Sequence, residues 1–220
     1  EIMDAQQIIS IIIFVVTMAA IMTEKVHRAL AAVAGATLLL VCQILDVESL
    51  ASYIDFNTVG ILIGMMLFVS VVKISGLFEY IAIKAAKLSK GKPWIIMILF
   101  FIITAVLSAF LDNVTTVLLV GPMTIAVTEM LGLNPVPFLI TQILASNIGG
   151  TATLIGDPPN IMIGSAAGLS FNDFIVNTGV PAVIIGILTI LCFYFIYGRK
   201  LHVTPEKMAA VMELDENKAI

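Results

Sequence analysis

Residues 146–160 read Ser146-Asn147-Ile148-Gly149-Gly150-Thr151-Ala152-Thr153-Leu154-Ile155-Gly156-Asp157-Pro158-Pro159-Asn160, and this stretch decides the expected fold. It lies within a long apolar run, but its paired glycines, paired prolines and acid cannot all belong to one uninterrupted helix. Non-helical backbone at membrane depth is tolerated only where protein buries it or where it lines a watery cavity. Broken helices of this kind build the ion and substrate sites of secondary transporters, so the stretch predicts solute transport.

The composition indicates an integral membrane protein, because the 220 residues are 60% hydrophobic and 12% charged, with a mean hydropathy of +1.11. A membrane span takes roughly 20 residues of helix. The apolar candidates are residues 8–22, 29–45, 59–75, 94–111, 114–131, 138–168 and 180–198. The sixth is too long for one simple span and contains the break. We therefore expect an all-α polytopic membrane protein.

The basic residues indicate how the chain crosses the membrane. In one alternating topology all eleven of them fall on the same face, following the first, third and last apolar segments. The charged residues of the opposite loops are all acidic, namely Asp46, Glu48, Asp55 and Asp173. Because cytoplasmic loops are enriched in Lys and Arg, the basic face is expected to be cytoplasmic. This predicts a multi-pass protein of the plasma or inner membrane, with its amino terminus outside and its carboxyl terminus in the cytoplasm.

About residues 76–92, apolar residues mix with Glu79 and several lysines. This pattern is typical of an amphipathic helix in the cytoplasmic interface, with its lysines near anionic headgroups. A plain cytoplasmic loop is the alternative that the composition leaves open.

A second polar point, Asp112 followed by Asn113, separates two apolar runs that are each about one membrane thickness long. Two structures fit. The runs either both span, with Asp112 in an outer turn, or they form a re-entrant hairpin about 94–131 whose tip lies near the midplane. An Asp-Asn pair is typical of a turn. However, the chain becomes apolar again at once, and ionisable groups inside a membrane are functional by default.

The two polar points offer oxygen ligands and a flexible backbone. The paired glycines can turn carbonyls toward a cation or amides toward an anion, and helix ends attract ions of the opposite sign. Gly156, Pro158 and Pro159 form the structural break, although a kink with satisfied polar groups is the bland alternative. The candidate ion- or substrate-binding residues are Asp112, Asn113, Thr115, Thr116, Ser146, Asn147, Gly149, Gly150, Thr151, Thr153, Asp157 and Asn160.

At Ser108-Ala109-Phe110-Leu111-Asp112-Asn113-Val114-Thr115-Thr116 and at residues 146–160 the chain resembles the ion-transporter superfamily, with its citrate-transporter-like domain. The nearest branch groups arsenite permeases, NhaD-type sodium–proton antiporters and the melanosomal P protein. The resemblance implies that the first stretch is the tip of a re-entrant hairpin and the second the unwound centre of the next helix. Related dicarboxylate carriers have Ser-Asn-Thr at the tip. The Asp112-Asn113-Val114 of this chain weakens a di- or tricarboxylate interpretation and favours a protonatable tip.

The resemblance also implies one inverted-repeat half, with about five transmembrane helices, a re-entrant hairpin and a broken helix at about 138–168. We expect residues 1–198 to form this single transmembrane repeat and residues 199–220 to form a cytoplasmic linker or tail. The chain then reads as the amino-terminal half of a longer permease, or less favourably as a small protein that pairs with a second copy as a homodimer. Besides that second repeat, the expected partners are membrane lipid and a small ion, with no nucleic acid.

The expected activity is secondary transport by alternating access. Burial raises the pKa of a carboxylate and a neighbouring cation lowers it, so a proton and Na⁺ can compete for Asp112. Na⁺ or H⁺ would be the coupling ion, with no other cofactor or metal. Permeation of arsenite or another anion, including a carboxylate, is the alternative within the superfamily. A passive channel is not separated from these by the sequence.

Two rival classes fit poorly. An intramembrane aspartyl protease would use Asp112 and Asp157 as a dyad, but Leu154 stands where those enzymes have a glycine. A phosphate-binding loop requires a lysine after its glycines, and this run has none. We therefore expect no enzyme activity.

Overall fold

The computed structural model of the chain describes residues 4–214, apart from the side chain of Ser49, and these residues form helices without strands. Residues 1–3 of the expected repeat and residues 215–220 of the expected tail lie outside the described residues. The chain divides into two compact units, Glu1–Asp55 and Phe56–Ile220, and each is described by itself.

The first unit consists mainly of two packed helices. Asp4 begins α1 (Ala5–Met22) with a capping box, in which its carboxylate accepts a bond from the Ala5 amide at 2.7 Å. The second helix, α2 (Arg28–Val41), contacts α1 closely enough that a side chain at Gly35 would collide with Thr17. It is shorter than the predicted apolar segment 29–45, because it ends at Cys42. Two short helices, α3 (Val47–Leu50) and η1 (Ala51–Tyr53), follow.

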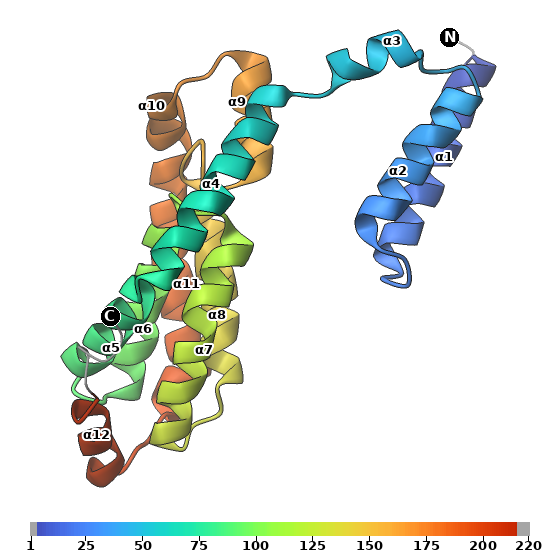
Figure 1. Ribbon diagram of the computed structural model, residues 1–220. Coiled ribbons are helices and arrows are strands. Elements are labelled where there is room, and N and C mark those ends of the chain that lie inside the picture. Colours follow the sequence, from blue (N-terminus) through green and yellow to red (C-terminus); the bar gives the residue numbers. More distant parts are fainter. Residues whose placement is uncertain (1–3, 215–220) are drawn as a thin grey trace. The chain divides into compact units, whose positions relative to one another are not determined.

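The second unit contains the two polar points. Its elements are α4 (Phe56–Ile74), α5 (Leu77–Leu88), α6 (Pro93–Ser108), α7 (Asn113–Leu131), α8 (Val136–Thr151), α9 (Pro158–Ala167), α10 (Phe171–Phe174), η2 (Ile175–Gly179), α11 (Val180–Ile196), η3 (Gly198–Lys200) and α12 (Pro205–Met212). Within this unit α5 and α12 gather at one end and α9 and α10 at the other (Figure 1).

Four helices among the described residues are long and apolar enough to cross a membrane: Ala5–Met22, Phe56–Ile74, Asn113–Leu131 and the continuous run Phe171–Lys200. The prediction of an all-α polytopic membrane protein is therefore confirmed. Two further apolar helices are shorter, Arg28–Val41 and Pro93–Ser108. At 1.5 Å per residue, the 16 residues of α6 extend about 24 Å, less than the ~30 Å hydrocarbon core.

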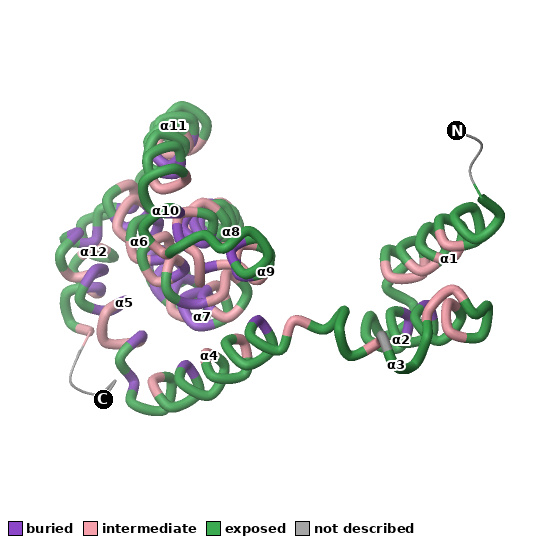
Figure 2. Tube along the Cα trace, turned by 90° about the horizontal axis from the view of Figure 1, so that it is seen from above, coloured by how far each residue is buried: buried purple, intermediate pink, exposed green. Residues whose placement is uncertain are grey.

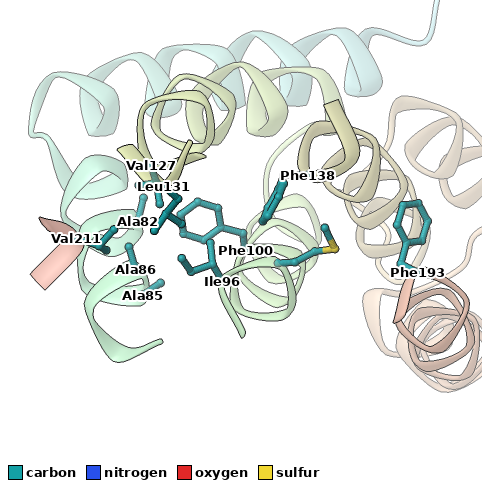
Figure 3. Packing of buried hydrophobic residues seen from close by; sticks show 11 residues of the cluster. Ala82, Ala85, Ala86, Ile96, Phe100, Val127, Leu131, Phe138, Phe193 and Val211 are labelled. Atoms are coloured by element: carbon teal, nitrogen blue, oxygen red, sulfur yellow. The ribbon is translucent and has the colours of Figure 1, made fainter. Parts of the chain in front are cut away.

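The centre of the second unit is the group α6, α7 and α8, where buried residues concentrate, while α4 and α11 are largely exposed (Figure 2). A large apolar cluster lies toward the end formed by α5 and α12 (Figure 3). It joins residues of six helices: Ala82, Ala85, Ala86, Ile96, Met97, Phe100, Val127, Leu131, Phe138, Phe193 and Val211. This cluster fixes the base of the α6–α7 hairpin. Near the tip, Leu111 packs in a second apolar cluster with Val69, Phe78 and Leu119, beside the polar contacts described below.

The segments predicted as an interfacial helix and as a tail both pack into this base. The region about 76–92 forms α5, whose apolar face is buried in the cluster; its location at a membrane surface stays a prediction. Part of the expected tail forms α12, in which Val211 is fully buried. Gly91, at a φ of +70°, lies so close to this helix that a Cβ there would be 2.7 Å from the Met208 backbone.

Candidate functional site

The turn between α6 and α7 lies directly against the break between α8 and α9. The Ser108 hydroxyl donates to the Ser146 carbonyl at 2.7 Å, and the Thr153 hydroxyl donates to the Ala109 carbonyl. These bonds join segments that are 38 and 44 positions apart in the sequence. The fold therefore brings the two predicted polar points together into one site.

Small residues allow three backbones to meet at this site. A Cβ on Gly156 would lie 2.6 Å from the Gly150 carbonyl oxygen and 2.7 Å from that of Ser108. A Cβ on Gly149 would overlap the Ala105 backbone, which shows how closely α8 approaches α6. Real Cβ atoms do not approach other atoms at such distances, so the close packing of the backbones requires glycine at these positions.

The break has a defined internal structure. The Asn160 side-chain nitrogen donates to the Gly150 carbonyl at 3.2 Å and to the Thr153 carbonyl at 2.9 Å. The Thr153 hydroxyl also accepts a bond from the Gly156 amide at 3.1 Å. Asp157 is extended, as expected before a proline, and α9 begins at Pro158, with Pro159 after it. Side chains thus bind the backbone groups that the broken helix leaves free.

Asp112 occupies the tip of the hairpin and caps α7. One carboxylate oxygen, Oδ1, accepts a bond from the Thr115 amide at 2.8 Å, while the Thr116 hydroxyl donates to the Asp112 carbonyl at 2.9 Å. The second carboxylate oxygen accepts no hydrogen bond from the described residues. Asp112 is partly exposed, and Asp157 is close enough for the two carboxylates to repel each other. The cap therefore orients a carboxylate that keeps one oxygen for a ligand.

Asn113, the next residue of the tip, makes a direct side-chain contact with α8. Its Nδ2 donates to Oδ1 of Asn147 at 3.1 Å. Nδ2 of Asn147 in turn donates to the Ile143 carbonyl at 2.7 Å, which fixes the orientation of this amide. A cavity of about 320 Å³ lies beside the pair, lined by Asn113, Val114, Val117, Leu118, Ile143, Ser146 and Asn147.

The predicted site residues fall into two groups in the structure. Buried residues of the break pack against the end of α6 and the tip, and these are Ser146, Gly149, Gly150, Thr153 and Gly156. Thr116 is also buried, but its hydroxyl bonds within the tip, to the Asp112 carbonyl. The accessible or half-buried residues are Asp112, Asn113, Thr115, Asn147, Thr151, Asp157 and Asn160. The second group supplies the atoms that a ligand could reach, although the Asn160 side-chain amide already donates to a backbone carbonyl within the break.

The sequence reasoning missed Asn177 and Thr178. They lie in η2, a single π-helical turn, and line a cavity together with Asn147 and Thr151. A π-helical turn marks an irregularity that is frequent at functional sites. The available signal is the triplet Asn177-Thr178-Gly179 shortly before Pro181, which lies just outside the predicted apolar segment 180–198.

The site offers neutral oxygens and carboxylates. No Lys, Arg or His lines the cavities beside Asn147. Among residues 4–214 no group of three or more His, Cys, Asp or Glu side chains could hold a transition metal. Carboxylate, amide, hydroxyl and carbonyl oxygens are the ligands that hard cations prefer.

Known proteins resemble the chain over most of its length. The family model for citrate transporters matches residues 18–214. The 46 kDa membrane protein of Mycobacterium leprae is 42% identical over 217 residues, covering 97% of this chain and 51% of that protein. An uncharacterised transporter of Mycobacterium tuberculosis is 41% identical over 217 residues, covering 97% and 50%. The human P protein is 44% identical over 200 residues, covering 84% and 23%.

The chain spans about half the length of the mycobacterial relatives that it matches. The resemblance inferred from residues 108–116 and 146–160 is confirmed, since the matched region includes both motifs. Together with the four membrane-length helices, the match identifies a multi-pass membrane protein. The chain belongs to the citrate transporter family, which consists of membrane transporters and not of enzymes.

Proposed function

We propose that this chain is one repeat of a secondary active transporter that exchanges a monovalent cation for protons by alternating access, with Asp112 as the exchanging group. The observation that carries the proposal is the position of Asp112 at the tip that contacts the broken helix, where the Thr115 amide holds one carboxylate oxygen and the other accepts no hydrogen bond from the described residues. A carboxylate in this setting can bind either a proton or Na⁺, and their competition couples the two fluxes.

The hairpin is proposed to be re-entrant. Its tip contacts residues 146–156, which lie in the middle of the α8–α9 run and not at its outer end. With α5 and α12 in the cytoplasm, as the distribution of lysines favours, α6 extends only about 24 Å and ends inside the membrane. This orientation puts Asp112 within reach of both faces during a cycle of alternating access.

The second half of the transporter is proposed to come from a further repeat of inverted topology, in the same natural chain or in a second copy. Asn147 and Thr151 are polar and exposed on the surface of this unit. Polar side chains at membrane depth normally face a protein interior or a watery cavity. A second repeat facing α8 would enclose them and complete the coordination of the ion.

Transport of citrate or another anion is the second candidate, favoured by the family match over residues 18–214. The lining of the site does not favour anion transport, because among the described residues no Lys, Arg or His side chain lines the cavities at Asn147. Neutral amides and helix ends would have to bind the carboxylates alone.

The test uses the complete natural protein in proteoliposomes that contain a pH-sensitive dye. External Na⁺ is expected to raise the internal pH, since protons leave as Na⁺ enters, and Asp112→Asn is expected to abolish the response. Asp112→Asn keeps an N-cap side chain, so folding is retained while the charge is lost. A Na⁺ response that survives in this variant, or uptake of radiolabelled citrate without any Na⁺-driven proton flux, would contradict cation–proton exchange at Asp112.

A further inference from the structure

A second cavity lies on the other side of Asn147 from the hairpin tip. It has a volume of about 300 Å³ and lies between α8 and the start of α11. Its lining is Asn147, Ile148, Thr151, Asn177, Thr178, Pro181, Ala182 and Ile185. Half of these side chains are polar, although the surrounding helices are strongly apolar. Asn147 lines both this cavity and the one beside Asn113, so the two cavities share a wall.

The π-helical turn η2 shapes this cavity. Pro181 has no amide hydrogen, so it cannot bond the Asn177 carbonyl four residues earlier, as a regular α-helix would require. The turn at Ile175–Gly179 is wider as a result, and it carries Asn177 and Thr178. The Thr178 hydroxyl lies 3.4 Å from the Ala152 carbonyl, which places η2 level with the break in α8.

The polar side chains of the cavity donate hydrogen bonds to nearby backbone carbonyls and keep oxygen lone pairs on Asn177, Thr151 and Thr178. The Asn177 amide nitrogen donates to the Asp173 carbonyl at 2.7 Å, and the Thr178 hydroxyl donates to the Phe174 carbonyl at 2.7 Å. The Thr151 hydroxyl likewise donates to the Asn147 carbonyl at 2.7 Å. What remains are the Asn177 side-chain oxygen, the lone pairs of two hydroxyl oxygens, and the second amide N–H of Asn177 and of Asn147.

An acceptor-rich lining without charged side chains selects the class of ligand. An anion would find only the remaining neutral amide N–H groups of Asn147 and Asn177, and among the described residues no Lys, Arg or His lines the cavity to bind its charge. A cation or a water-coordinated ion finds oxygen ligands instead. The volume is too large for a bare ion and holds roughly ten water molecules at ~30 Å³ each, enough for a cation with its hydration shell.

We propose that the cavity formed by Asn147, Thr151, Asn177 and Thr178 is a binding site for a hydrated monovalent cation on its way to or from Asp112. This inference rests on the proposed cation–proton exchange and adds a second, preceding site on the path. Asn147 belongs to both sites and passes the cation from the η2 oxygens to the Asn113 side of the hairpin. The cation sheds its water there, where the carboxylate of Asp112 replaces it.

The test is equilibrium binding of ²²Na⁺ to the complete purified protein. Asn177→Ala and Thr178→Val are each expected to weaken Na⁺ binding about tenfold, as the loss of one ligand worth ~1.4 kcal/mol would do. Asn177→Asp is expected to strengthen it by a similar factor, a gain that misfolding cannot produce. The matched controls are Asn172→Ala, Asn172→Asp and Thr189→Val. Asn172 is exposed and lies outside the cavity. The Thr189 hydroxyl, like that of Thr178, donates to the carbonyl four residues earlier in its helix.

The outcomes separate this inference from the proposed function. The second site alone would be overturned if Na⁺ binding and exchange require Asp112 but are the same in the Asn177 variants as in their controls. Weaker Na⁺ binding in Asn177→Asp than in wild type would also overturn it. A wild-type protein that binds no ²²Na⁺ would overturn both proposals together.

Discussion

Asn113 and Asn147 are 34 positions apart in the sequence, and Nδ2 of the first donates a 3.1 Å hydrogen bond to Oδ1 of the second. This bond is the direct side-chain link between the accessible parts of the hairpin and the broken helix. Asn147 is oriented by its own bond to the Ile143 carbonyl, so the pair has a fixed polarity. Asn147 lines both the cavity at the hairpin and the cavity at η2, whereas Asn113 lines the first.

The coupling between these two amides is measurable. Asn113→Ala and Asn147→Ala are each expected to lower the free energy of unfolding, and the double variant should lose about 1 kcal/mol less than their sum. The measurement is a double-mutant cycle from reversible denaturation of the complete protein in mixed micelles. Strict additivity would contradict a stabilising bond between the two side chains.

Two substitutions of Asp112 are expected to separate its role as the N-cap of α7 from its proposed role in cation–proton exchange. Asp112→Ala removes the N-cap of α7 and is expected to destabilise the protein by about 1 kcal/mol, whereas Asp112→Asn should change stability much less, because both Asp and Asn cap helices well. Both variants should lose cation–proton exchange. Thermal unfolding beside the proteoliposome assay tests this. Equal destabilisation by the two substitutions would show that the charge, and not the cap, stabilises the tip.

The close backbone contact at the break predicts an effect of adding one methyl group. Gly156→Ala should destabilise the protein by about 1–3 kcal/mol or more, because the new Cβ meets the backbones of Gly150 and Ser108. Gly64→Ala is the matched control, since no atom lies within 4 Å of its added Cβ and it sits inside α4. That variant should be neutral or more stable by about 1 kcal/mol at most. Similar melting temperatures for the two variants would contradict the described packing.

Replacing threonine by valine at two buried positions near the site is expected to change the stability of the protein in opposite directions. Among residues 4–214 the buried Thr104 hydroxyl has no hydrogen-bond partner, whereas the Thr124 oxygen accepts a hydrogen bond from the Gln142 side-chain amide. Thr104→Val is therefore expected to stabilise the protein by about 1 kcal/mol, and Thr124→Val to destabilise it by about 1–3 kcal/mol. Denaturation of both variants of the complete protein gives the sign. A loss of stability in Thr104→Val would indicate a bound water or another partner at this hydroxyl.

The sequence predicts the break and the hairpin turn because both depend on local chemistry. Pro158 and Pro159 cannot continue an incoming helix, and Asp112 is a strong N-cap; accordingly α9 begins at Pro158 and α7 begins at Asn113. The sequence also predicts that the paired glycines interrupt the helix, but they lie inside α8, which ends at Thr151. The resemblance adds that the two places meet, which local chemistry does not reveal. The roles of the candidate residues as ion ligands stay predictions.

What the sequence does not reveal depends on contacts between distant segments. Thr153 looks like a free ligand in the sequence, but its hydroxyl is used on the Ala109 carbonyl and the Gly156 amide. Asn177 was passed over because its importance comes from the wider turn before Pro181 and from its neighbours on α8. The α12 helix was read as part of a polar tail, and only the burial of Val211 shows that it packs into the unit.

Asn160 has a consequence for ion selection. Because its single amide holds the carbonyls of both Gly150 and Thr153, the backbone at the break is preorganised before any ion arrives. The side chains of Asn113 and Asn147 are held as well, by their bond to each other and by the bond from Asn147 to the Ile143 carbonyl. Under the proposed cation exchange, an entering ion would therefore meet polar groups whose positions are set in advance. We propose that the radius of the ion is selected by this fixed geometry.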